Sequence, residues 1–323
     1  MITNYLILEF SIIKKNIPRE EIKQIVEEYL TKGRKDYELE LPMTGVDMNV
    51  YKIFFLGEIF WLRIPSSIDT NYEVEVKIHK DLTKMGAHVP EVIAYEEKNK
   101  ILNVPIMILR DIGGEPLFEN NMIGLESAVI DAGRDLALIN SLEVKNYGYV
   151  DNMNKNKILH GSPTFKSFKE FCLGNFYFHL QNITKWGVLT TEQSEKIRDI
   201  FMKESENLLY SDRPYLIHGD YKPEHIFIKN SQYVGVIDFS DIQGGSNLWD
   251  LAHVRAFSEE YYQLLKKGYN DFNSSIIISD ERIFFYGLVQ WVHKLNFVGW
   301  NNYEKAKKHL GVKYCKKCIE YFS

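Results

Sequence analysis

The chain has 323 residues, of which 45% are hydrophobic and 26% charged, a composition typical of a globular protein with room for two domains. A formal net charge of -5 argues against a broad electrostatic surface for nucleic acid. The three cysteines are too few for a disulfide scaffold, and no uncharged apolar stretch has the length of a membrane span. We therefore expect a cytoplasmic protein, a monomer or a weak dimer, without a nucleic-acid or membrane partner.

The first part of the chain alternates between helical and strand-like patterns. Pro18 and the carboxylates that follow it predict the start of a short helix. Residues 50–57 and 59–65 have strand character around a Gly-Glu turn, which predicts a β-hairpin. The segment 72–85 has helical spacing, and residues 89–112 hold two further strand-like runs around a polar turn. These patterns predict a small lobe that is rich in β-sheet.

A segment with the sequence GGEP follows at residues 113–116 and predicts a linker. Beyond it the sequence is mainly helical, with one β-rich island at residues 214–239. The predicted helices span residues 122–142, 165–182, 191–209, 247–267 and 280–298. The predicted fold class is therefore α+β, organised as an N-terminal lobe at 1–110, a hinge at 111–117 and a larger helical lobe at 118–323.

The residues that carry chemistry gather in the β-rich island, which reads YLIHGDYKPEHIFIKNSQYVGVIDFSD from 215 to 241. Two short strands flank a turn, and a hairpin of this length brings the loop at 218–225 close to Asp238. Phosphoryl transfer needs one carboxylate to orient the attacking hydroxyl, a second to hold magnesium, and a further metal ligand beyond the first. Asp220, Asp238 and His225 fit these three roles in that order.

The motifs HGDxxxxH and IDFS together resemble the catalytic loop and metal loop of the aminoglycoside phosphotransferase family. The resemblance implies the two-lobed fold of protein kinases, with ATP or GTP and Mg²⁺ as cofactors. It extends to GGSNLWDLAHV at 244–254, where it implies that Asp250 braces the catalytic loop, and it makes His218 a supporting residue.

The chain departs from the usual family pattern at two positions of the island. His225 stands where asparagine is usual, and Ser240 stands where the metal loop usually has glycine. Imidazole is a softer ligand than magnesium prefers, so we expect His225 to bind the ion weakly or through a water.

The same resemblance implies a phosphate-binding pair in the N-terminal lobe. Arg63, on the second strand of the hairpin, stands where the family has its phosphate-binding cation, and a guanidinium group can span two phosphate oxygens. Its carboxylate partner is expected at Glu75, and Glu73 is the alternative on another face of the helix.

Two further nucleotide contacts follow from the resemblance. A loop at residues 43–53 with a single glycine, Gly45, is expected to cover the phosphates. Backbone groups from Ile108 to Arg110, just before the hinge, are expected to meet the adenine or guanine edge.

Three functions fit these residues. The first is a nucleotide-dependent O-phosphotransferase that acts on a small-molecule hydroxyl, most readily on a cationic aminoglycoside-type antibiotic. The amines of such an antibiotic would meet carboxylates of the helical lobe, unless these carboxylates only form solvated helix faces. The candidate carboxylates are Glu259, Glu260, Asp271, Asp280 and Glu281. The second is the same reaction on choline, homoserine, a thiosugar or a fructosamine. The third is a catalytically silent member that binds a nucleotide or a partner, motivated by His225 and Ser240.

Overall fold

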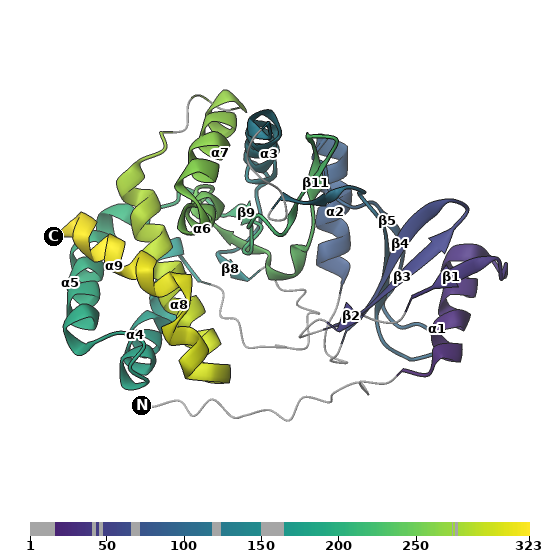
Figure 1. Cartoon of the computed structure of the whole chain (residues 1–323), viewed down its shortest axis with the longest axis horizontal. Helices are drawn as coiled ribbons and strands as arrows, with labels where there is room; N and C mark the ends of the chain where they lie inside the picture. The colour runs from purple at the N-terminus through teal and green to yellow at the C-terminus, as the bar shows by residue number, and fades with distance from the viewer. Residues whose placement is uncertain are drawn as a thin grey trace. The chain divides into compact units, whose positions relative to one another are not determined.

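The computed structural model describes residues 17–40, 43–44, 48–65, 72–117, 124–149, 165–272, 274 and 277–323. These residues divide into two compact units, the first up to Ile112 and the second from Gly113 onward. In Figure 1 the first unit is drawn mainly in purple and blue, and the second runs from teal to yellow. Each unit has its own sheet structure and its own apolar core.

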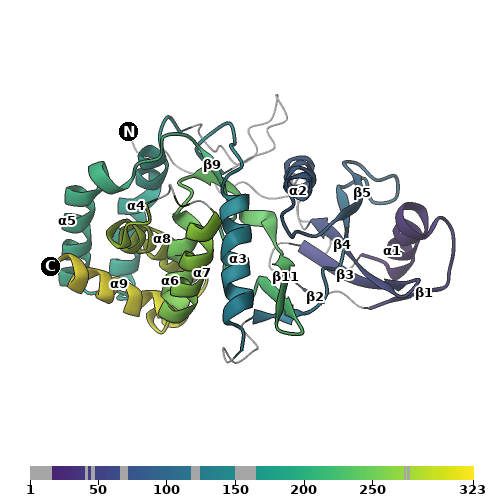
Figure 2. The same cartoon turned by 90° about the horizontal axis from the view of Figure 1, so that it is seen from above.

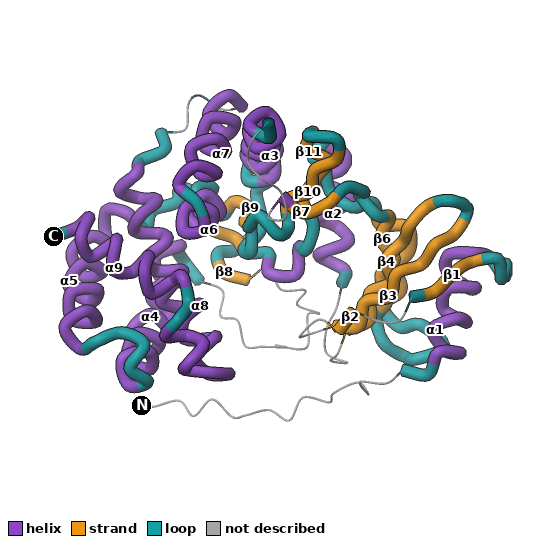
Figure 3. Tube along the Cα trace, in the orientation of Figure 1, coloured by secondary structure: helices purple, strands orange, loops and turns teal. Residues whose placement is uncertain are grey.

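The first unit is built on an antiparallel sheet. Its strands are β1 (Tyr37–Leu39), β2 (Met43–Thr44), β3 (Met48–Phe55), β4 (Glu58–Pro65), β5 (Val92–Glu96) and β6 (Ile106–Arg110). They lie in the order β1-β3-β4-β6-β5, and β2 also pairs with β3. Figure 3 draws these strands in orange. The predicted hairpin is confirmed as β3 and β4, with its turn at Leu56-Gly57. Both turn residues have positive φ, which matches the twist of a tight hairpin.

Two helices cover opposite faces of this sheet, α1 (Arg19–Val26) and α2 (Glu73–Met85), as Figures 1 and 2 show. The layer under α1 contains Ile22, Ile25, Val26, Phe60, Leu62 and Ile64. The layer under α2 contains Trp61, Tyr72, Val76, Met107 and Leu109. Side chains alternate between the faces of a strand, so even positions of β4 face α1 and odd positions face α2. Arg63 therefore points to the side of α2.

The second unit is mainly helical. Its helices are α3 (Glu126–Ile139), α4 (Phe168–Lys185), α5 (Thr191–Leu208), α6 (Trp249–Phe257), α7 (Glu259–Phe272), α8 (Asp280–Lys307) and α9 (Leu310–Phe322). Helices α3 and α7 pack side by side, as Figure 2 shows. No helix in the described part of the chain has both the length and the apolar character needed to cross a membrane.

The prediction of a single helix at 247–267 is wrong, because the structure has two helices there. Ser258 lies between α6 and α7 in an extended conformation, with φ −154° and ψ 126°. Its hydroxyl accepts a hydrogen bond from the Tyr261 amide at 3.2 Å, which is the action of a residue that caps the start of a helix. The apolar periodicity continues across this break, which explains why the pattern alone does not reveal it.

Short strands complete the second unit and position its loops. One sheet joins β11 (Gln232–Val236), β10 (Ile226–Lys229) and β7 (Glu115–Pro116), and the other joins β8 (Gly148–Tyr149), β12 (Gln243–Gly245) and β9 (Tyr215–Ile217). The segment expected to be a linker thus supplies β7, a strand of this unit. Gly114 has φ +79°, and a Cβ there would lie 2.3 Å from the Ile228 carbonyl oxygen. The close approach of β7 to β10 therefore requires glycine.

Candidate active site

The loop that follows β9 is anchored by one buried carboxylate. Asp250, in the first turn of α6, accepts hydrogen bonds from the backbone amides of His218 at 2.9 Å and Gly219 at 3.0 Å. The Asn140 side chain donates a third bond to Asp250 at 2.9 Å and also bonds the Leu216 carbonyl. Three donors offset much of the cost of burying a carboxylate. The bonds fix the start of the loop relative to α3 and α6.

Gly219 brings this loop against the segment that follows Asp238. Its φ is +86°, and a Cβ at this position would lie 2.0 Å from the Asp241 carbonyl oxygen. A side chain is excluded by both the conformation and the contact. The glycine of the HGD motif is therefore a requirement of the local geometry.

His218 is fully buried and connects the loop to the strand that leads to Asp238. Its Nε2 lies 2.9 Å from the Ile237 carbonyl oxygen, and the Asp220 amide donates to its Nδ1 at 3.3 Å. These partners define a neutral ring with its proton on Nε2. Burial lowers the pKa of His218, which agrees with the neutral form.

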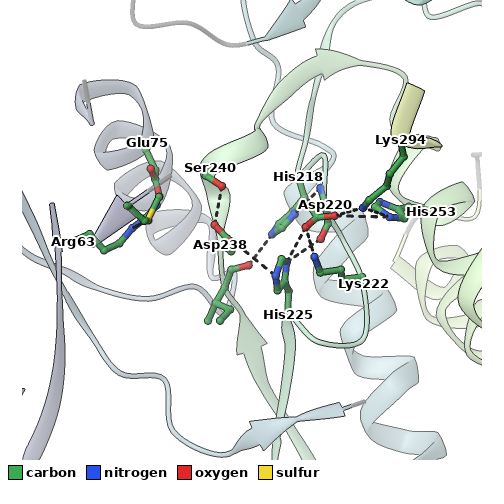
Figure 4. A network of polar contacts seen from close by, with 12 residues as sticks. Arg63, Glu75, His218, Asp220, Lys222, His225, Asp238, Ser240, His253 and Lys294 are labelled. Atoms are coloured by element: carbon green, nitrogen blue, oxygen red, sulfur yellow. Dashed lines mark hydrogen bonds and ion pairs between the residues drawn. The ribbon is translucent and has the colours of Figure 1, made fainter. Parts of the chain in front are cut away.

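Asp220 lies among three nitrogen-bearing side chains, drawn in Figure 4. The Lys294 ammonium donates to its Oδ1 at 2.8 Å, and Lys222 donates to its Oδ2. His253 Nε2 is 3.8 Å from Oδ1. Burial by itself raises the pKa of Asp220, but the charge of Lys294 above all, with the hydrogen bonds from Lys222 and Lys294, lowers it well below its usual range. Asp220 is therefore an ionised carboxylate held in a fixed orientation.

His225 connects Asp220 to Asp238, as Figure 4 shows. Its Nδ1 lies 3.0 Å from the Asp220 backbone oxygen, and its Nε2 lies 3.6 Å from Asp238 Oδ2. Because the carbonyl only accepts, the proton sits on Nδ1 and leaves the Nε2 lone pair facing Asp238. Burial and then Lys222 lower the pKa of His225, which favours this neutral form.

Asp238, two residues after the end of β11, has an uncommon backbone conformation. Its φ of 69° and ψ of 69° are left-handed, which is uncommon for a residue other than glycine. The Ser240 hydroxyl donates to Asp238 Oδ1 at 2.8 Å, so the second oxygen is the one that faces His225. Ser240 thus orients the carboxylate where the family usually has glycine.

The side chains of His225 and Asp238 are the groups of this loop and hairpin that could hold a metal ion. In the described part of the chain no group of three or more His, Cys, Asp or Glu side chains is arranged to hold a metal. Mg²⁺ commonly takes only one or two ligands from the protein and completes its shell with waters and substrate phosphates. The Nε2 atom of His225 and Oδ2 of Asp238 would be those two ligands.

The first unit contains a buried ion pair between a strand and a helix. Arg63 on β4 donates through its guanidinium to Glu75 on α2, and both side chains are almost fully buried. His79, one turn further along α2, has its Nε2 3.8 Å from the same carboxylate. Burial by itself raises the pKa of Glu75, but Arg63 and His79 lower it to about 2. The structure therefore pairs Arg63 with Glu75, while the alternative, Glu73, is exposed.

This pair predicts an acid-sensitive contribution to stability. Glu75 has a pKa of about 2 in the folded chain against 4.5 unperturbed, so its contribution is complete above about pH 4.5 and is lost as the pH falls toward 2. In urea unfolding, the difference in free energy between wild type and Glu75→Gln should shrink by about 2 kcal/mol from pH 7 to about pH 3. A difference that stays constant with pH would show that Glu75 is not held ionised by Arg63.

Ile108 and Arg110, two of the other residues predicted to contact the nucleotide, lie on β6 of the first unit. Ile108 is fully buried in the middle of the sheet and pairs with Leu62 on one side and Ala94 on the other. The Arg110 amide, at the end of β6, donates to the Glu91 carbonyl oxygen at 2.9 Å. Gly45 lies outside the described residues, as do the two residues after it, and the rest of the segment predicted as a loop belongs to strands β2 and β3.

Four side chains of the site were missed by sequence reasoning. Lys222 follows Asp220 by two positions and had a local signal, because a loop residue so close in sequence can reach the same carboxylate. His253 lies in the segment GGSNLWDLAHV on α6 and Asn140 ends α3, but only the packing of α3 and α6 shows where these side chains point. Lys294 lies 74 positions after Asp220 and had no signal in the sequence.

Comparisons with known structures agree with this fold. A complex of a thermostable mutant of aminoglycoside phosphotransferase APH(4)-Ia with ADP and hygromycin B is 15% identical and superposes with a TM-score of 0.68, covering 92% of this chain and 97% of that one. A putative fructosamine-3-kinase from Thermobifida fusca is 15% identical with a TM-score of 0.65 (92% and 98% covered). The gentamicin complex of APH(2")-IIa is 16% identical with a TM-score of 0.62 (94% and 97% covered). No curated protein sequence matches the chain.

The sequence comparison gives the family. The profile of the phosphotransferase enzyme family matches residues 57–274, more than half of the chain, from the hairpin turn to the end of α7. The α+β, kinase-like fold expected from the sequence is confirmed by the solved structures. With the HGD and IDFS loops inside the matched region, the chain belongs to the phosphotransferase enzyme family, as its resemblance to aminoglycoside phosphotransferases implied.

Proposed function

We propose that the protein is a nucleotide-dependent O-phosphotransferase that phosphorylates a hydroxyl of a small molecule. The observation that carries this proposal is the convergence of Asp220, His225 and Asp238 in one loop and hairpin. His225 bonds the backbone of Asp220 through one ring nitrogen and faces Asp238 with the other. An ionised, oriented carboxylate next to two metal-ligand atoms is the arrangement that phosphoryl transfer requires.

Each residue has a separate role in this proposal. Asp220 accepts the proton of the attacking hydroxyl, and Asp250 and His218 hold its loop in place. Asp238 and His225 hold Mg²⁺, which neutralises phosphate charge when it is bound. Arg63, oriented by Glu75, binds phosphate oxygens of ATP or GTP. Catalysis then rests mainly on position and electrostatics.

Two observations bear on the acceptor class, and they point in different directions. The APH(4)-Ia and APH(2")-IIa structures are complexes with hygromycin B and gentamicin, which supports an aminoglycoside-type antibiotic and a role in resistance. However, three of the carboxylates that could bind amines are already paired inside the chain. Glu259 bonds Arg255, Asp280 bonds Arg255 and Lys266, and Asp271 bonds Arg134.

A metabolite is the second candidate acceptor, and the two lysines on Asp220 favour one without a cationic group next to its hydroxyl. An ammonium group of an acceptor would have to approach a carboxylate that already has Lys222 and Lys294 as partners. The candidate metabolites are choline, homoserine, a thiosugar and a fructosamine. With either type of acceptor, the proposal places the protein in the cytoplasm as a monomer or a weak dimer.

The function is tested by thermal shift and product release with ATP-Mg²⁺ and GTP-Mg²⁺ against panels of aminoglycosides and of these metabolites. A nucleotide at 100 times its dissociation constant should stabilise the folded protein by about 2.7 kcal/mol. Release of ADP or GDP that depends on one acceptor would identify the substrate class. Binding of nucleotide without release in any mixture would favour the catalytically silent alternative.

The magnesium ligands give a sharper prediction at His225. Replacing His225 by asparagine exchanges an imidazole nitrogen for an amide oxygen, which magnesium prefers. We expect the Mg²⁺ concentration for half-maximal activity to fall by about tenfold, or about 1.4 kcal/mol of binding free energy. The measurement is a Mg²⁺ titration of initial rates for both proteins. An unchanged midpoint would show that His225 does not bind the metal.

A further inference from the structure

Lys294 is placed against Asp220 by the packing of a long helix. On α8, Trp291, Val292 and Leu295 are buried in the core of the second unit, which turns Lys294 toward the loop after β9. Its ammonium donates to Asp220 Oδ1 at 2.8 Å and lies 3.2 Å from His253 Nε2. Burial lowers the pKa of His253 well below its usual value, so its neutral ring can accept a bond from Lys294. Lys294 is held by two partners from different elements, as Figure 4 shows.

Both oxygens of Asp220 are therefore occupied by ammonium donors. Lys294 binds Oδ1 and Lys222 binds Oδ2. A carboxylate offers about four lone-pair positions, so a substrate hydroxyl can still donate to it, but only beside a lysine. Groups bound to the carbon next to that hydroxyl would lie roughly 5 Å from an ammonium, a distance at which like charges repel measurably in a partly buried site.

The surrounding helix adds no negative charge that would reverse this preference. From Arg282 to Tyr303 the sequence of α8 contains neither aspartate nor glutamate. The nearby Asp241 also interacts with Lys294, and burial raises the pKa of this carboxyl. One turn after Lys294, the exposed residue is Phe297, an uncharged aromatic ring.

We infer that Lys294 is a positioning and specificity-determining residue, which holds Asp220 in place and disfavours acceptors with an ammonium group next to the reacting hydroxyl. The acceptor of this chain then carries an uncharged or anionic substituent at that position, and any amines lie further away. This inference rests on the proposed function, because it assigns Asp220 to the acceptor hydroxyl. Lys222 is two residues after Asp220 and can reach this carboxylate within the loop. Lys294 reaches it only because the second unit packs α8 against the loop.

The test compares acceptors that differ at one nitrogen. Aminoglycosides and amino sugars are offered with ATP-Mg²⁺ in two forms, one with the amine next to a hydroxyl free and one with it N-acetylated, and kcat and KM are measured by ADP release. Wild type should prefer the acetylated form by about tenfold in kcat/KM, mainly through KM. Lys294→Met should lower kcat and reduce the preference without abolishing it, because Lys222 stays on the other oxygen of Asp220, while Lys294→Arg should restore the preference.

The control is Lys305→Met, which removes an exposed lysine from the same helix and should change neither parameter. Melting temperatures of all variants separate misfolding from a change in preference, and Lys294→Arg keeps the test decisive if the methionine variant is unstable. A preference for free amines in wild type, or an unchanged ratio in Lys294→Met, would overturn the inference alone. No ADP release with any acceptor would remove the proposed function, and the inference with it.

Discussion

Replacing Asp220 by asparagine is expected to lower kcat by about 10²–10⁴-fold and to leave the KM of the acceptor nearly unchanged. Asparagine has the same shape and still offers one oxygen to Lys294 or to a hydroxyl. It cannot accept the proton, because its amide is not basic. The lysines that lose their charged partner keep access to solvent, since Lys294 is 32% and Lys222 22% exposed in their side chains. The effect should therefore appear in the chemical step, measured by steady-state release of ADP or GDP.

Asp199→Asn provides a matched control for this experiment. Asp199 lies on the exposed face of α5, and its partner is the adjacent Arg198. Its replacement should leave kcat and KM within the error of the assay. If the Asp220 variant kept a rate within about threefold of wild type, Asp220 would not be the general base, and the reaction would need another group to take the proton.

The second large effect is expected on stability, from Asp250→Ala. This substitution removes the acceptor of three hydrogen bonds and leaves the His218 and Gly219 amides and the Asn140 side chain without that partner in a buried place. Each orphaned donor costs about 1–3 kcal/mol, so we expect the free energy of unfolding to fall by about 3–5 kcal/mol. Urea unfolding followed by tryptophan fluorescence reports this directly, because Trp249 is buried beside the substituted residue.

Asp131→Ala tests whether the effect comes from burial rather than from loss of an aspartate. Asp131 is about half exposed on α3 and pairs with Arg134. Its removal should cost less than about 1 kcal/mol, as is usual for surface ion pairs. Equal losses for the two variants would contradict the anchoring role of Asp250. A loss of activity in Asp250→Ala that persists under conditions where the protein is folded would show that the loop geometry also depends on this carboxylate.

The sequence predicted well wherever neighbours in the chain are neighbours in space. The hairpin of β3 and β4 follows from the alternation of its side chains and its short turn, and the same alternation turns Arg63 toward α2. The hairpin of β10 and β11 brings His225 within 3.6 Å of Asp238, as its length indicated. Local geometry of this kind is fixed by a few dihedral angles.

Prediction failed where long-range packing decides the outcome. The break at Ser258 interrupts no apolar pattern, and only the separate packing of α6 and α7 makes it visible. Lys294 reaches Asp220 because buried residues around it set the rotation of α8, and periodicity alone does not give that rotation. The order of strands, which places Ile108 between β4 and β5, is also not given by the strand-like runs alone. Sheet order and helix rotation depend on contacts across the chain.

The anchoring of the loop by Asp250 also has a consequence for the order of folding. Its partners are far apart in sequence, because Asn140 and Asp250 are separated by 110 positions and His218 and Asp250 by 32. Contacts at such separation form late, since the chain entropy of closing long loops opposes them until the intervening helices have packed. During refolding from urea, far-ultraviolet circular dichroism should therefore recover before catalytic activity does. The newly made chain would spend this interval with its helices formed and its catalytic loop not yet assembled.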